Sequence, residues 1–101
     1  MIEALDGPSK QFVITVDSVT PLKVEEGGAS LSDRKVVTMQ GDAKFYVYLA
    51  GDDEIPTAND LITKGFTQYK NAKESYEAGE FQAIYVLSIS GISNIRIAER
   101  A

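Results

Sequence analysis

The stretch FQAIYVLSISGISNIRIAER, residues 81–100, decides how the fold of this 101-residue chain is interpreted. Two runs rich in β-branched and aromatic residues flank Ser90 and Gly91, a pair typical of a two-residue hairpin turn. Side chains in a strand alternate between its two faces. The pattern therefore predicts a hairpin whose core face consists of Ile84, Val86, Ile95 and Ile97.

The second face of the first strand in this predicted hairpin is also apolar. Tyr85 and Leu87 lie there together with other apolar residues, namely Phe81, Ala83 and Ile89. On the partner strand Arg96 is expected beside Tyr85, with its guanidinium over the ring. The run KFYVYLA, residues 44–50, repeats the trait: Tyr46 and Tyr48 stand opposite the core residues Phe45, Val47 and Leu49.

Two explanations account for this second apolar face. Either it is a subunit interface, or the long segment GDDEIPTANDLITKG, residues 51–65, covers it within one chain. Exposed apolar patches larger than a few hundred Å² mark contact sites, which favours the interface. The predicted interface residues are Ile2, Leu5, Tyr46, Tyr48, Tyr85, Leu87 and Arg96.

Short β-like runs separated by turn residues continue along the whole chain. They are QFVITV, PLKVEE, RKVVTMQ joined to KFYVYLA as a second hairpin, FTQY, ESYEA and the two runs of residues 81–100. Turn signals every 8 to 12 residues are typical of a β-sandwich or barrel. The sequence therefore predicts an all-β fold, a single β-sandwich or jelly-roll-like barrel of about eight short antiparallel strands.

Helix is expected to be limited to one turn at most. Thr57 and Asp60 form a candidate cap over Leu61 and Ile62, and Gly65 would end the turn.

Residues 1–10 are interpreted as an N-terminal arm, because Gly7, Pro8 and Ser9 interrupt regular structure, and residues 11–101 as the sandwich domain. Ile2 and Leu5 would let the arm dock on a neighbouring molecule. The alternative is a frayed terminus, the common state of chain ends that nothing ties down.

Composition excludes several classes of function. The net charge of −5 disfavours nucleic acid and anionic membrane as partners. The chain has no Cys and no His, which removes most transition-metal sites and most nucleophile–base pairs. No apolar run approaches the ~20 residues of a membrane span, and the first ten residues do not form a signal peptide. We therefore expect no catalytic residues, no cofactor and no metal, and synthesis in a cytoplasm.

Acidic residues gather in one segment as Asp52, Asp53, Glu54 and Asp60. Calcium takes oxygen ligands from such loops, but the spacing differs from that of an EF-hand, so a solvated acidic loop is favoured. An acid–base pair of Asp52 and Asp53 would lack the apolar surroundings that separate two carboxyl pKa values. The basic residues, Arg34 among them, are interpreted as an ordinary mixed surface.

The order of these motifs resembles that of small tailed-bacteriophage virion proteins. The matching segments are RKVVTMQ, FYVYLAGD, TANDLITKGF, ESYEAG and AIYVLSISGISNIRIAE, and they lie within residues 34–99, a span of about two-thirds of the chain. The chain departs from the pattern in having Ala50-Gly51 for a double glycine and in the insert TQYKNAK. The resemblance implies a β-sandwich or jelly-roll component that decorates or cements the head lattice or forms the base of head and tail fibres, commonly as a trimer.

These observations leave three functional hypotheses. The first is a non-enzymatic capsid decoration or cement protein, a homotrimer that binds the major capsid protein and resides in the virion after assembly in the host cytoplasm. The second is a fibre- or tail-associated module that binds a receptor or carbohydrate, with Tyr46, Tyr48, Tyr69 and Tyr76 as stacking platforms. The third is an enzyme or calcium-dependent domain centred on the acidic segment, which is the least favoured.

Overall fold

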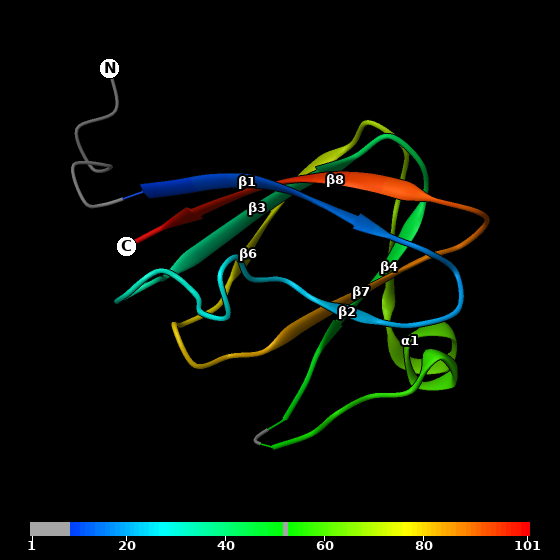
Figure 1. The fold of residues 1–101 in the computed structure, drawn as a ribbon, viewed down its shortest axis with the longest axis horizontal. Coiled ribbons are helices and arrows are strands. Elements are labelled where there is room, and N and C mark those ends of the chain that lie inside the picture. Colours follow the sequence, from blue (N-terminus) through cyan, green and yellow to red (C-terminus); the bar gives the residue numbers. More distant parts are fainter. Residues whose placement is uncertain (1–8, 52) are drawn as a thin grey trace.

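Two antiparallel four-stranded sheets pack face to face in the computed structural model, which describes residues 9–51 and 53–101 (Figure 1). Sheet A has, in spatial order, β1 (Ser9–Val16), β8 (Ser93–Arg100), β3 (Val36–Gly41) and β6 (Lys73–Glu77). Sheet B has β2 (Leu22–Lys23), β7 (Ile84–Ser88), β4 (Phe45–Leu49) and β5 (Phe66–Gln68). The prediction of an all-β sandwich with about eight short strands is confirmed.

Successive strands alternate between the sheets, apart from β4 and β5, which are neighbours in sheet B. This winding corrects both predicted hairpins. β7 and β8 lie in opposite sheets, and so do β3 and β4, so neither pair shares backbone hydrogen bonds. The turn residues reverse the chain as expected, with Gly91 at φ +66°, but the next strand crosses the core to the other sheet.

The core between the sheets contains the residues that alternation places inward. Ile84 and Val86 of sheet B are buried with Ile95 and Ile97 of sheet A, as predicted. The other strands contribute inward residues in the same way: Phe12, Ile14, Val16, Val37, Met39, Phe45 and Val47. Leu22 is the exception, because it is 37% exposed on the short edge strand β2.

The helix α1 (Ala58–Lys64) comes after β4 and carries the predicted cap. The Thr57 hydroxyl accepts a hydrogen bond from the Asp60 amide, and the Asp60 carboxylate accepts one from the Thr57 amide. Gly65 is the C-cap. Seven residues make about two turns, so the helix is longer than the single turn expected. In the described ranges no helix is long and apolar enough to cross a membrane.

The sandwich begins two residues earlier than predicted. Ser9 and Lys10, assigned from the sequence to the arm, belong to β1 and lie opposite Arg100 and Glu99 of β8. Ile2 and Leu5, the predicted docking residues of the arm, lie outside the described residues.

Candidate functional site

The outer face of sheet B, where the sequence placed an interface, is partly covered by α1. The helix packs against β4 and β7 on the side away from sheet A (Figure 1). Leu61 of the helix is 0% exposed and Leu87 of β7 is 1% exposed, and neither belongs to the core between the sheets. Leu87 therefore lies inside the folded chain beneath α1 and is not exposed to a partner.

Beyond α1 the same face remains open as a cleft of about 610 Å³. Tyr85 of β7 lies opposite Tyr48 of β4 and Lys23 of β2, and both tyrosines are half-buried. The lining comprises Lys23, Gly51, Asp53, Glu54, Ile55, Phe81, Ala83 and Tyr85. Two of these side chains are almost fully exposed, Phe81 at 90% and Ile55 at 84%. Together with Tyr85 these two side chains form a solvent-exposed apolar rim. We call the whole cleft, including this rim, the Phe81 cleft.

Glu54 fixes the loop on one side of the Phe81 cleft. Its carboxylate accepts hydrogen bonds from the Gly51 amide at 2.8 Å and from the Tyr48 hydroxyl at 2.7 Å. These donors, the amide first, lower the pKa of Glu54, and the same carboxylate raises the pKa of Tyr48. At neutral pH the pair therefore consists of an ionised Glu54 and a neutral Tyr48, which joins the loop to β4.

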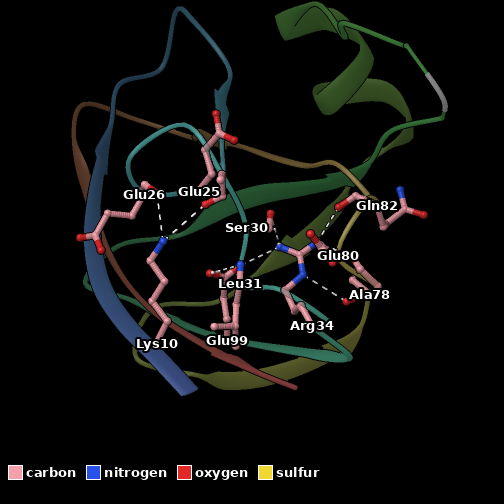
Figure 2. A network of polar contacts seen from close by, with 12 residues as sticks. Lys10, Glu25, Glu26, Ser30, Leu31, Arg34, Ala78, Glu80, Gln82 and Glu99 are labelled. Atoms are coloured by element: carbon pink, nitrogen blue, oxygen red, sulfur yellow. Dashed lines mark hydrogen bonds and ion pairs between the residues drawn. The ribbon is translucent and has the colours of Figure 1, made fainter. Parts of the chain in front are cut away.

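Arg34 fixes the loop of residues 78–83, between β6 and β7, on the other side of the Phe81 cleft (Figure 2). Its guanidinium donates to the carbonyl oxygens of Ala78, Gly79 and Gln82 at 3.1, 2.8 and 2.6 Å. It also donates to Ser30 Oγ at 3.0 Å and to Glu99 Oε2 at 2.7 Å. All five guanidinium N–H groups are thus satisfied. Both side chains of the Arg34–Glu99 ion pair are 0% exposed.

Phe81 owes its position to this polar network. The residue lies between two acceptors of Arg34, Gly79 and Gln82, so its backbone is held while its ring faces solvent. Gln82 also donates from Nε2 to the Ala50 carbonyl at 2.6 Å, which joins the loop to the end of β4. The Phe81 ring is therefore presented by a fixed loop and not by a free tip.

The other end of the network holds the loop before β3. Glu99 Oε1 accepts from the Leu31 amide at 3.3 Å, and Glu80 accepts from the Asp33 amide at 2.9 Å. Lys10 donates from Nζ to the carbonyl oxygens of Glu26 and Ala29 (Figure 2). Loops at this end of the sandwich are thus tied to strands β1 and β8.

The remaining predicted interface residues lie apart from one another. Arg96 is in sheet A, opposite Val13 and Gln40, so the expected pair with Tyr85 does not form. Tyr46 is half-buried on β4, in the sheet that α1 covers. Among the described residues of the predicted set, Tyr85 lines the Phe81 cleft and Tyr48 lies opposite it on β4.

The tyrosines proposed as stacking platforms do not share one surface. Tyr76 packs against the core and donates its hydroxyl to Gln68, whereas Tyr46 and Tyr48 stand on the outer face of sheet B. Tyr69 is 62% exposed, but Lys44 Nζ lies 5.4 Å from the centre of its ring. These four residues therefore do not build a single aromatic platform.

Two carboxylates of the acidic segment form hydrogen bonds within the chain. Glu54 accepts two hydrogen bonds and Asp60 caps α1, while Asp52 lies outside the described residues. Among the residues that the structure describes, no group of three or more acidic side chains is arranged to hold a metal ion. Glu54 and Asp60 thus stabilise the local fold of this segment.

Sequence reasoning missed the buried ion pair and the rim of the cleft. Glu99 could have been found, because alternation from Ile95 and Ile97 places it on the core face, where a carboxylate requires a partner. Arg34 carried no such signal, because it precedes the regular part of β3. Ile55 and Phe81 lie in loops, where alternation does not apply, so their approach to each other depends on the tertiary fold.

Comparisons with known proteins bear on the fold. No family model matches the chain, and no curated protein has a matching sequence. A de novo designed double-stranded β-helix, solved by solution NMR, has a TM-score of 0.51 at 13% identity, over 91% of this chain and 97% of that chain. A structure of the disulfide-linked pili of Bacillus endospore appendages has a TM-score of 0.45 at 10% identity, over 92% of this chain and 87% of that chain. The chain is thus similar in fold to a double-stranded β-helix, in keeping with its alternation of strands between two sheets.

Proposed function

We propose that this chain is a non-enzymatic structural protein of a tailed-phage virion. In this proposal it binds the major capsid protein lattice as a homotrimeric decoration or cement protein and stabilises the head. Association is its activity, and the Phe81 cleft is the surface that contacts another virion protein.

The observation that carries the proposal is the fixed display of apolar side chains at this cleft. Phe81 and Ile55 are 90% and 84% exposed, yet the loops that carry them are held by the Arg34 network and by Glu54. A rigid aromatic anchor loses little conformational entropy when it is buried by a partner. A cleft beside the exposed side chains of Phe81 and Ile55 suits a protein partner with an apolar projection.

The resemblance to phage virion proteins supports the same proposal in a different way. Its first and last motifs include Arg34 and Glu99, which form the buried ion pair. In this chain the pair joins the loop before β3 to the last strand, so the two motifs are in contact in the fold. The resemblance is the reason for proposing a virion protein, and the Phe81 cleft is the surface proposed to contact another virion protein.

The test is binding to phage heads that lack decoration protein. Phe81→Ser and Ile55→Ser should each reduce binding and the protection of heated heads, by about tenfold or more for Phe81. Ile92→Ser is the matched control, because Ile92 is 58% exposed in the connection between β7 and β8, away from the cleft lining. Equal loss in the control, or no binding of the unaltered protein, would contradict the proposal.

The oligomeric state is tested separately by size-exclusion chromatography with light scattering over a dilution series. A homotrimer has a mass near three times 11.0 kDa. A mass of 11.0 kDa at every concentration would remove the trimer from the proposal and leave assembly on the lattice, which the head-binding experiment measures directly.

A further inference from the structure

The outer face of sheet A differs from the Phe81 cleft in both shape and chemistry. Cross-strand register puts Gln11, Ala98, Thr38 and Ser75 in one row of this face. The next row contains Val13, Arg96, Gln40 and Lys73. No helix packs on this sheet among the described residues, so the rows face solvent.

The face is hollowed along its length. One hollow of about 410 Å³ spans β1, β8, β3 and the start of β6, with Gln11, Thr38, Lys73 and Arg100 in its lining. A second hollow of about 360 Å³ shares Val13, Gln40 and Arg96 with the first. Together they form a trough that crosses the sheet, which we call the sheet A trough. Its length suits a chain-like ligand more than a single small molecule.

The sheet A trough contains several basic side chains, although the protein as a whole is acidic. Lys73, Arg96 and Arg100 line the sheet A trough, and none of the three forms an ion pair within the described ranges. Glu77 is on the same face, two strands from Arg100. Asp42 lines the far end of the second hollow, where Asn94 donates two hydrogen bonds to it. The centre of the trough is therefore cationic although the chain carries a net charge of −5.

The neutral side chains of the trough indicate which anion it suits. The apolar lining residues Phe12, Met39 and Ile97 are buried in the core. The neutral side chains on the outer face are the amides and hydroxyls of Gln11, Thr38, Gln40, Asn71 and Asn94, together with Val13 and Ala98. Protein interfaces are centred on aromatic anchors and arginine, and the lining of this trough has two arginines but no exposed aromatic anchor. Amide and hydroxyl groups both donate and accept hydrogen bonds, as sugar hydroxyls require, and the cations match carboxylates.

We propose that the sheet A trough binds an acidic polysaccharide. Its carboxylates contact Arg96, Lys73 and Arg100, and its hydroxyl groups exchange hydrogen bonds with Gln11, Thr38 and Gln40. This site is separate from the Phe81 cleft and does not depend on the capsid-binding proposal.

The experiment measures binding of the full chain to polygalacturonate oligomers by titration calorimetry at low and moderate salt. We expect measurable binding that weakens as salt screens the cations. Arg96→Gln and Lys73→Gln should each weaken it roughly three- to tenfold, and the double variant more. Lys64→Gln is the matched control, because it removes one charge from α1 on the opposite side of the sandwich and should leave the affinity unchanged.

Each other outcome overturns the proposal. Absence of binding to polygalacturonate removes the site. Equal affinity for polyglutamate would assign the trough to acidic protein segments instead. Equal weakening in the Lys64→Gln control would mean that total charge, and not this face, governs the interaction. Thermal unfolding of each variant, which should match that of the unaltered protein, shows that the fold is retained.

Discussion

Leu87 and Val13 are both apolar residues on the outer face of a sheet, yet Leu87 is 1% exposed and Val13 is 62% exposed. The sheets contribute similar strands to a common core, and the difference arises from the segments that connect those strands. The segment after β4 folds back as α1 and covers sheet B, whereas no described element covers sheet A. Alternation along a strand shows which residues point away from the core. Tertiary structure decides whether those residues contact solvent or are covered by another element.

The largest expected effect comes from Leu87→Asp. An unpaired carboxylate beneath α1 should lower the free energy of unfolding by more than about 4 kcal/mol, a large part of the stability of a domain of this size. Ile84→Asp in the core should do the same. Val13→Asp is the matched control on the open face and should change stability by about 0.5 kcal/mol or less. Urea unfolding monitored by circular dichroism measures the free energy of unfolding of all three variants. Similar losses for Leu87→Asp and Val13→Asp would show that α1 does not bury Leu87.

Arg34→Met should give the next largest effect, because it leaves Glu99 as a buried charge without a partner. A loss of about 3–5 kcal/mol in the free energy of unfolding is expected. The carbonyl oxygens of Gly79 and Gln82 would also lose their donor, so hydrogen exchange should increase in residues 78–82. Lys35→Met alters the exposed neighbour and serves as the control. A stable variant with a fixed Phe81 loop would show that the network does not hold this side of the cleft.

Gly65→Ala tests how closely α1 approaches sheet B. A Cβ at this position would lie 2.5 Å from the Leu61 carbonyl oxygen and 2.9 Å from that of Val47, both backbone atoms. The helix must therefore shift away from β4, at a cost of about 1–3 kcal/mol. Gly79→Ala is the control, because its nearest atom is 3.9 Å away. Equal stability of the two variants would contradict the close contact.

The smallest effect concerns pH and Glu54. Its pKa in the folded chain is below the ordinary value of 4.5, so its contribution to stability is present above that pH and is lost as the pH falls through the folded pKa. Asp17, Asp42 and Asp60 have lowered pKa values for the same kind of reason, namely hydrogen bonds to their carboxylates. Unfolding measured from pH 7 to pH 3 should show a shallower decline for Glu54→Gln. An unchanged decline would mean that the Gly51 and Tyr48 contacts do not stabilise the loop.

The sequence predicted the fold class, the core residues and the helix cap, because these depend on alternation and local hydrogen bonding. It did not predict which strands pair. A turn such as Ser90-Gly91 reverses the chain whether the next strand lies alongside or crosses to the other sheet, and the same residues face inward in both cases. Of the candidate site, the tyrosine-bearing face of sheet B was found, while the rim formed by Ile55 and Phe81 required the tertiary arrangement of two loops.

The pairing of β1 with β8 has a consequence for how the protein is made. Ser9 lies opposite Arg100, so this pairing joins the first and the last strand of the described part of the chain. During synthesis β1 remains without its partner until β8 has emerged. Folds dominated by such distant contacts form slowly, in roughly milliseconds to seconds. Until then the apolar residues of β1 are available to neighbouring nascent chains, so we expect yield to depend on expression rate and temperature more than on final stability.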